Sequence, residues 1–201
     1  MNRKDLVSIL ELVYPALADN ALVPILTCFA FNQNTVMAYN DTLGIVANCD
    51  VGDKPFAVNG KILIGLLQNS QSEDVELIVE KEHVLVKAGR SDFKLPYFGE
   101  KDFLFSEPDE KWNAQLKINA DLLKGFEICR STSSSDATMP AIMGISLNID
   151  INKPITLYSC DGDAVTRYFT ETGKGKTKST HTLPNAFCDA VTKICNDTTI
   201  N

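Results

Sequence analysis

The amino-acid sequence gives nearly the same pattern twice, and this internal repeat constrains the fold more than any single residue does. In each copy, apolar residues at helical spacing are followed by several short strand patterns and then by a second helix pattern. Residues of the two copies match at a nearly constant separation. The matched pairs are Asp5-Leu6 with Asp121-Leu122, Pro24 with Pro140, and Asp41 with Asp161. The repeat predicts two similar domains.

Helices and strands are expected in the same order in both copies. The first copy predicts helices over Arg3–Leu17 and Gly60–Gln68, a strand starting at Val23, and strands over Thr35–Tyr39, Leu43–Cys49, Lys54–Val58, Val75–Glu80, His83–Lys87 and Ser91–Leu95. The second predicts a strand over Gln115–Ile118, a helix from Asn119 to Arg130, strands over Met139–Ile149, Ile155–Cys160 and Ala164–Phe169, a loop over Thr172–Ser179 and a helix from Pro184. The fold class is α+β, with helices packed on antiparallel sheets.

The repeat divides the chain near residue 112. A first domain over residues 1–112 contains both helices and both groups of strands, and the proline-containing acidic stretch 104–114 is typical of a linker. A second domain over residues 113–201 follows the same order as far as its second helix. By the template of the first domain, three more strands should follow, so we expect the second domain to be truncated.

The charge balance disfavours a protein that holds nucleic acid tightly on an open surface. The net formal charge is −7 and the isoelectric point is about 4.8, whereas proteins that bind nucleic acid by counterion release are usually basic. Hydrophobic residues make up 44% of the chain, no apolar run is long enough to span a membrane, and the first residues do not form a secretion signal. We expect a cytoplasmic globular protein.

Cysteine and histidine placement gives no indication of a metal site, a disulfide framework or a cofactor. The six cysteines form no C-x-x-C pair and mostly lie on apolar faces, where a reduced thiol acts as a small hydrophobic group. His83 and His181 are isolated. We therefore expect neither a metal nor a cofactor.

Two stretches imitate catalytic motifs, and neither has the spacing that the chemistry needs. Gly175-Lys176-Thr177 is similar to the end of a phosphate-binding loop, but Thr170 stands where the first glycine belongs and no helix pattern follows directly. The run Ser131–Asp136 offers hydroxyls and an acid, without a nearby histidine or a nucleophile elbow. The sequence predicts a protein that is not an enzyme.

An ordered set of short motifs covers nearly the whole chain. In the first copy these are Val23-Pro-Ile-Leu26, Tyr39-Asn-Asp41, Ala57-Val-Asn-Gly-Lys-Ile62, Val86-Lys-Ala-Gly-Arg-Ser-Asp-Phe93 and Lys101-Asp-Phe103. In the second they are Leu122-Leu-Lys-Gly-Phe126, Gly144 and Leu157-Tyr-Ser-Cys-Asp-Gly162. The set resembles the first and second domains of the beta subunit of bacterial DNA polymerase III, the DNA sliding clamp.

The resemblance implies a ring-shaped, non-catalytic processivity factor for DNA replication. Clamps of this family assemble six similar domains from a homodimer of three-domain chains and encircle duplex DNA without reading its sequence. Short peptide motifs attach the DNA polymerase and the clamp loader to them. A closed ring is retained by topology, so an acidic chain is compatible with this role. The resemblance implies that these 201 residues are the N-terminal part of such a chain and bind DNA only weakly alone.

The resemblance also implies three sites. Candidates for the DNA channel, each of which could equally be an ordinary solvated helix residue, are Arg3, Lys4, Asn20, Lys61, Gln68, Lys124, Arg130 and Lys193. The hydrophobic slot for partner peptides would include Ile142, Gly162, Asp163 and Val165, with Asp163 where the family commonly has histidine. Phe103 matches an apolar residue that the family buries against the neighbouring subunit, and it could equally belong to the core of its own domain.

A second interpretation stays open from the sequence. A two-domain protein could use the clamp fold as a scaffold for protein contacts without encircling DNA. The length of the natural chain separates the two interpretations. A mass well above the 22.1 kDa of this sequence would favour the ring, and a mass equal to it would favour the scaffold.

Overall fold

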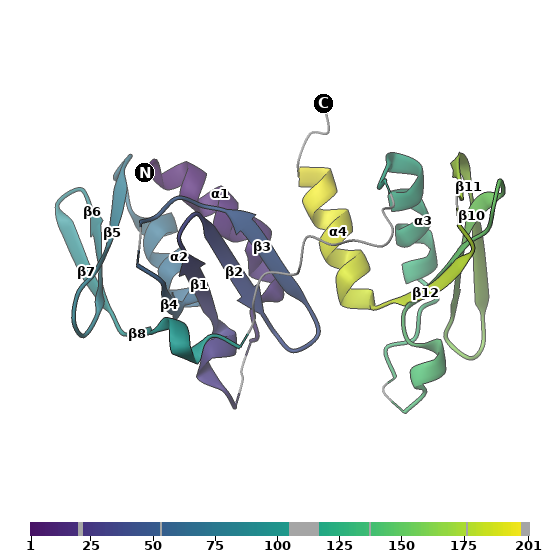
Figure 1. Ribbon diagram of the computed structural model, residues 1–201, viewed down its shortest axis with the longest axis horizontal. Helices are drawn as coiled ribbons and strands as arrows, with labels where there is room; N and C mark the ends of the chain where they lie inside the picture. The colour runs from purple at the N-terminus through teal and green to yellow at the C-terminus, as the bar shows by residue number, and fades with distance from the viewer. Residues whose placement is uncertain (20–21, 53, 105–116, 137, 176, 198–201) are drawn as a thin grey trace. The chain divides into compact units, whose positions relative to one another are not determined.

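The chain forms two compact units, Met1–Glu110 (unit 1) and Lys111–Asn201 (unit 2). The computed structural model describes residues 1–19, 22–52, 54–104, 117–136, 138–175 and 177–197 (Figure 1). Both units are built from helices and antiparallel sheets, so the α+β prediction is confirmed. No helix in these described ranges has the length and apolar character needed to cross a membrane.

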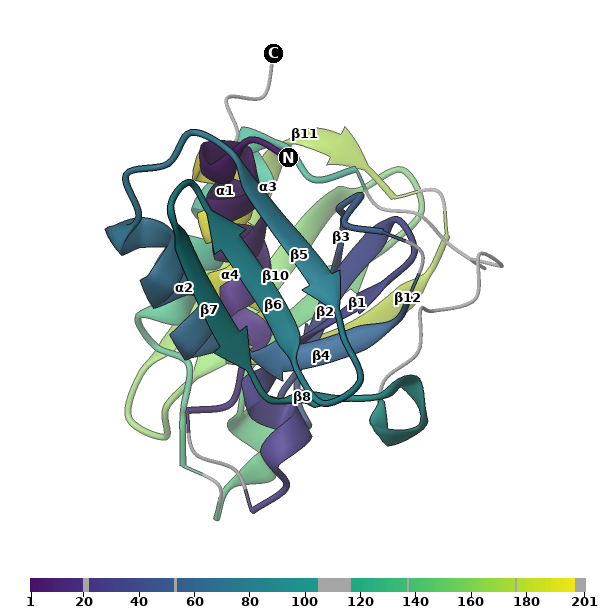
Figure 2. The ribbon, with the colours of Figure 1, turned by 90° about the vertical axis from the view of Figure 1, so that its left-hand side faces the viewer.

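Unit 1 combines two helices with two antiparallel sheets. Its helices are α1 (Arg3–Val13) and α2 (Gly60–Asn69), with short 3-10 helices η1 (Tyr14–Ala16), η2 (Pro24–Thr27) and η3 (Glu100–Asp102). The larger sheet has the order β3-β2-β1-β4-β8, from β1 (Cys28–Asn32), β2 (Thr35–Tyr39), β3 (Gly44–Asn48), β4 (Phe56–Asn59) and β8 (Tyr97–Phe98). The second sheet, β5 (Val75–Val79), β6 (Val84–Ala88) and β7 (Ser91–Leu95), is in front in Figure 2.

Unit 2 repeats the two helices of unit 1 and four strands of its larger sheet. It contains α3 (Ala120–Arg130), η4 (Pro140–Ile142), β9 (Ile145–Ile149), β10 (Pro154–Cys160), β11 (Val165–Lys174), β12 (Ser179–Leu183) and α4 (Asn185–Asp197). The sheet order β11-β10-β9-β12 is the topology of β3-β2-β1-β4 in unit 1. The internal repeat seen in the sequence is therefore confirmed as a repeat of topology.

Each unit has its own apolar core between its helices and its sheet. In unit 1, α1 and α2 bury Leu10 and Leu63 completely, and the rings of Phe31 and Phe56 stack with centroids 4.7 Å apart. In unit 2, Phe126 of α3 packs in one cluster with residues of β9, β10 and α4. Burial of a large apolar side chain contributes about 1.5–3 kcal/mol. The apolar faces that defined the repeat are the faces that hold each unit together.

Asparagines start three of the helices. A side-chain oxygen of an N-cap residue accepts a hydrogen bond from a backbone N–H that the helix itself leaves unpaired. The caps are Asn2 to the N–H of Lys4, Asn59 to that of Ile62, and Asn119 to that of Leu122. The predicted role of Asn59 is confirmed.

The two strands predicted to begin at Val23 and Met139 start later than expected. Pro24 and Pro140 instead open 3-10 turns, closed by hydrogen bonds of 3.1 Å from Leu26 N–H to Val23 O and from Ile142 N–H to Met139 O. Proline lacks an N–H and has a fixed φ, which suits the first position of a helical turn. The apolar residues after each proline had the appearance of a strand, and this part of the prediction was wrong.

Two smaller predictions also differ from the structure. β11 runs to Lys174, so the first part of the expected loop Thr172–Ser179 is strand. Lys117 and Ile118 are not in a strand, and the rest of the strand predicted over Gln115–Ile118 lies outside the described residues. Most of the predicted linker 104–114 lies outside them as well.

The turn after the second strand of each copy shows how the repeat aligns. Asn40 Oδ1 accepts from the N–H of Leu43 at 2.9 Å, and Asp161 Oδ1 accepts from the N–H of Ala164 at 2.8 Å. The next residue has a positive φ in both turns, 72° at Asp41 and 103° at Gly162. Asp161 is therefore equivalent to Asn40, and the sequence pairing with Asp41 was one residue off.

Candidate nucleic-acid interface

Three of the predicted channel lysines are exposed on helices. Lys4 lies on α1, Lys124 on α3 and Lys193 on α4. In the part of the chain that the structure describes, no side-chain hydrogen bond or ion pair holds the ammonium group of any of them. Their ammonium groups are available to an anion from solution. Asn20, also predicted for the channel, lies outside the described residues.

Lys61 of α2 is held by a carboxylate that follows α1. Its Nζ lies 2.8 Å from Asp19 Oδ1 and 3.3 Å from the Asp19 carbonyl oxygen. The hydrogen bond from Lys61 lowers the pKa of the Asp19 carboxyl, and the same bond raises the pKa of Lys61. Both groups are charged at neutral pH, and both are exposed to solvent.

Gln68, further along α2, also has a carboxylate partner. Its Nε2 donates to Glu11 Oε1 of α1 at 3.0 Å, and both side chains are exposed. Polar pairs thus join α2 to α1 at Glu11–Gln68 and to the segment after α1 at Asp19–Lys61.

Arg3 takes a structural position rather than an open one. Its Nε donates to the carbonyl oxygen of Ser72 at 2.7 Å, and its Nη1 donates to that of Leu67 at 2.9 Å. Leu67 belongs to the last turn of α2, whose carbonyls lack partners within the helix. The half-buried guanidinium therefore completes the end of α2.

Arg130 lines a groove between α3 and α4 of unit 2. Its Nε donates to both carboxylate oxygens of Asp189, at 3.0 and 3.1 Å. The groove is lined by Phe126, Glu127, Arg130, Cys188, Asp189, Thr192 and Lys193. Two acidic residues, Glu127 and Asp189, and two basic residues, Arg130 and Lys193, are among these, so the formal charges balance.

The residues predicted for the peptide slot lie near one end of the unit 2 sheet. Gly162 and Asp163 form the exposed turn between β10 and β11, and Val165, at the start of β11, is 72% exposed. Ile142 lies in η4 and is half-buried. Ser134 connects the β10–β11 turn with the segment around η4. Its N–H donates to the carbonyl oxygen of Cys160, at the end of β10, at 3.1 Å, and its backbone forms an isolated β-bridge with Met143.

Two residues of this end escaped the sequence prediction. Met139 and Met143 flank η4 and are exposed, although methionine is usually buried. Met139 was assigned to the start and Met143 to the interior of a strand, where an apolar residue is expected. The signal that could have found them is Pro140, which ends the strand pattern.

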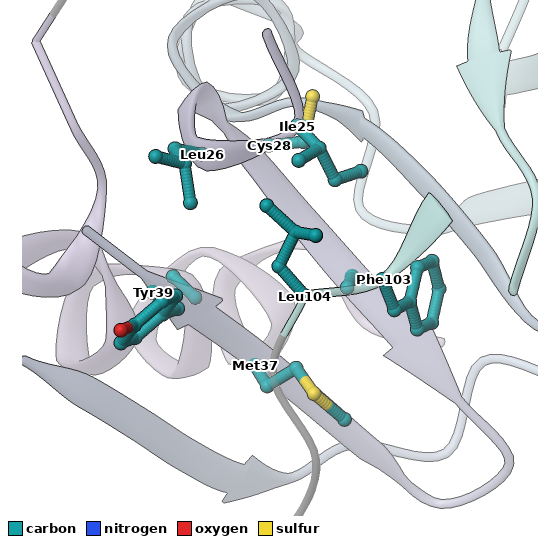
Figure 3. A pocket seen from close by; sticks show the side chains of 9 residues that line it. Ile25, Leu26, Cys28, Met37, Tyr39, Phe103 and Leu104 are labelled. Carbon is teal, nitrogen blue, oxygen red and sulfur yellow. The ribbon is translucent and has the colours of Figure 1, made fainter. Parts of the chain in front are cut away.

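Phe103 packs on its own unit. It is half-buried against a cluster of Cys28, Ala30, Met37 and Ala57 on the larger sheet. Figure 3 shows it next to Leu104, which lines the same pocket and is 59% exposed.

No metal centre is visible in the ranges that the structure describes. No group of three histidine, cysteine or acidic side chains gathers there. All six cysteines are free, and burial raises the pKa of Cys28 and Cys129, that of Cys49 to about 11 and that of Cys188 to about 12. A thiol with a raised pKa is a poor nucleophile at neutral pH.

Searches with protein-family models and against curated protein sequences give no match. Solved structures do match. The putative DNA polymerase III beta subunit of Eubacterium rectale superposes on 96% of this chain with a TM-score of 0.88 and 17% identity. The beta subunit of Thermotoga maritima covers 99% with a TM-score of 0.79 and 19% identity, and the polymerase sliding clamp of Bacillus subtilis covers 96% with 0.82 and 16%.

The chain has the sliding-clamp fold. It spans about half the length of these structures, 55% of the Eubacterium rectale and Bacillus subtilis chains and 56% of the Thermotoga maritima chain. The fold prediction made from the motif order is confirmed. At these identities, the likeness concerns the fold alone.

Proposed function

We propose that this chain belongs to a DNA sliding clamp, a non-catalytic factor that encircles duplex DNA and tethers the replicative polymerase. The observation that carries the proposal is the superposition of 96% of the chain on a DNA polymerase III beta subunit with a TM-score of 0.88. The exposed lysines on α1, α3 and α4 support it, since helix faces of a clamp meet the phosphate backbone.

The helix faces carry basic side chains of which some are paired with carboxylates, and this modest positive charge suits the function. A ring held by topology needs no high affinity, and strong phosphate contacts would slow its movement along the duplex. Lys4, Lys61, Gln68, Lys124, Arg130 and Lys193 are the described channel candidates, and we retain Asn20 from the sequence. Arg3 is set apart from these candidates, because its guanidinium donates hydrogen bonds to backbone carbonyls of its own unit.

Residues 1–112 would form the first clamp domain and residues 113–201 the second, in the cytoplasmic homodimer of a longer chain. Phe103 and Leu104 would contribute to the contact between subunits. In support, Leu104 exposes an apolar side chain beside a pocket lined by Ile25, Met37 and Phe103.

The polymerase and the clamp loader would bind through short peptide motifs at the end of unit 2. The slot would be formed by Ile142, Gly162, Asp163 and Val165. Exposed apolar side chains around it support a hydrophobic anchor, and Met139 and Met143 extend the set. Methionine adapts its shape to different apolar partners.

Retention on circular DNA tests the proposal. The natural full-length protein is incubated with nicked circular DNA and with an extract of its source that supplies loading activity, and the DNA is isolated by gel filtration at high salt. The protein should elute with the circles and be released when a restriction enzyme cuts them. Equal retention on circular and linear DNA, or none on either, would contradict a ring and favour the two-domain scaffold.

A further inference from the structure

In each unit, one cation on a helix is paired with a carboxylate from another segment. In unit 1 Asp19 holds Lys61, and in unit 2 Asp189 holds Arg130. Building on the proposed function, we propose that Asp19 and Asp189 compete with DNA phosphate for these cations and thereby set how weakly the helix faces hold the duplex.

The groups that meet in these pairs are the groups that would meet at a phosphate. The guanidinium Nε of Arg130 donates to both oxygens of Asp189, and a phosphate offers the same pair of acceptors. The Nζ of Lys61 bonds one carboxylate oxygen and one carbonyl oxygen of Asp19. Each carboxylate therefore imitates one contact with the DNA backbone.

Solvent exposure allows exchange between the two acceptors. The side chains of Lys61 and Asp19 are 47% and 90% exposed, and those of Arg130 and Asp189 are 36% and 54% exposed. Exposed ion pairs are weak and are screened by salt. A phosphate can therefore reach the cation, and it must displace a carboxylate that stays nearby and repels it.

The described helix faces also carry lysines without a carboxylate partner, with which the two paired cations can be compared. Lys4, Lys124 and Lys193 have no such partner among the described residues. The helix faces thus combine open lysines, which attract the duplex, with covered cations, which contribute only after exchange. Removal of the carboxylates of Asp19 and Asp189 should leave the paired cations as open to DNA phosphate as the unpaired lysines are.

Salt dependence of binding measures this conversion. The full 201-residue chain is titrated into a fluorescein-labelled duplex at a series of sodium chloride concentrations, and binding is followed by fluorescence anisotropy. The variants are Asp19→Asn, Asp189→Asn and their combination. Each new phosphate contact makes the slope of log affinity against log salt more negative by about 0.9. The slope of the double variant should be about 1.8 more negative than that of the wild type, and the double variant should bind about ten-fold more tightly at low salt.

Two control variants separate local from general charge. Asp92→Asn removes one negative charge from β7, on the second sheet of unit 1, and should leave the slope unchanged. Arg130→Gln combined with Asp189→Asn removes the cation together with its cover and should return the slope to that of the wild type. Circular dichroism verifies that every variant is folded.

The salt titration and the circle experiment can fail independently of each other. If the wild type binds and the double variant has the same slope, or if Asp92→Asn steepens the slope as much, the competition does not exist, while retention of the natural protein on circular DNA would still support a clamp. If neither the wild type nor the double variant binds duplex at the lowest salt, the freed cations are not phosphate sites and the inference is wrong. Failure of the circle experiment alone contradicts the proposed function and leaves the measured slopes intact.

Discussion

The two units share one strand order and differ in what holds their second helix. In unit 1, Arg3 bonds the end of α2, and backbone bonds join the N-terminus to the second sheet, from Val75 N–H to Met1 O at 3.0 Å. In unit 2, α4 is held at its start by Asn185, which bonds Ser133 and Ser134, and at its surface by the Arg130–Asp189 pair. One architecture therefore holds its second helix through different residues in the two units.

The helix glycines should give the largest difference between the units. A Cβ at Gly125 of α3 would lie 2.7 Å from Cδ1 of Tyr168, whereas a Cβ at Gly65 of α2 meets nothing within 4 Å. Gly125→Ala should lower the free energy of unfolding of unit 2 by about 1–3 kcal/mol through overpacking. Gly65→Ala should raise that of unit 1 by about 0.5–1 kcal/mol, because alanine favours helix.

Hydrogen exchange read by mass spectrometry measures the effect unit by unit during urea unfolding. The essential result is that Gly125→Ala lowers the free energy of unfolding of unit 2 while Gly65→Ala raises that of unit 1. Tyr168 cannot move aside freely, since its hydroxyl donates to Asp121 Oδ1 at 2.7 Å. Equal stabilisation by both alanines would show that α3 can shift away from its sheet.

The two arginines should give a smaller contrast. Arg3→Ala removes two hydrogen bonds to carbonyls and should cost unit 1 about 1–3 kcal/mol, with little dependence on salt. Arg130→Ala removes an exposed ion pair and should cost unit 2 about 0.5 kcal/mol or less, an amount that added salt reduces. Urea midpoints at low and high sodium chloride provide the measurement. A large, salt-insensitive loss for Arg130→Ala would mean that the surface pair is as structural as Arg3.

The smallest effect concerns Tyr168 of unit 2. Its hydrogen bond to Asp121 raises the pKa of the phenol from 10.0 to about 12. Because the folded-state pKa is above the unfolded value, the bond stabilises unit 2 fully below pH 10, and this stability is lost as the pH rises toward 12. The difference in melting temperature between the wild type and Tyr168→Phe should shrink over this range. A constant difference up to pH 12 would contradict the role of the bond, and unit 1 in the same samples is the control.

Sequence reasoning predicted the order of helices and strands because apolar periodicity is a local signal that the repeat states twice. It failed at Pro24 and Pro140, where apolar neighbours concealed a 3-10 turn. It also found the cations of the helix faces but not their partners. Asp19 is 42 residues from Lys61, and Asp189 is 59 residues from Arg130, so these pairs exist only after the helices have packed.

The exchangeable pairs on the helix faces have a kinetic consequence for a clamp. A bare cation that leaves one phosphate must wait for the next one with only water as its acceptor, and this raises the barrier between successive positions on the duplex. At Arg130 and Lys61 a carboxylate is present at 2.8–3.0 Å to accept the hydrogen bonds during that interval. In the proposed clamp, Asp19 and Asp189 would therefore lower these barriers and raise the one-dimensional diffusion coefficient of the ring.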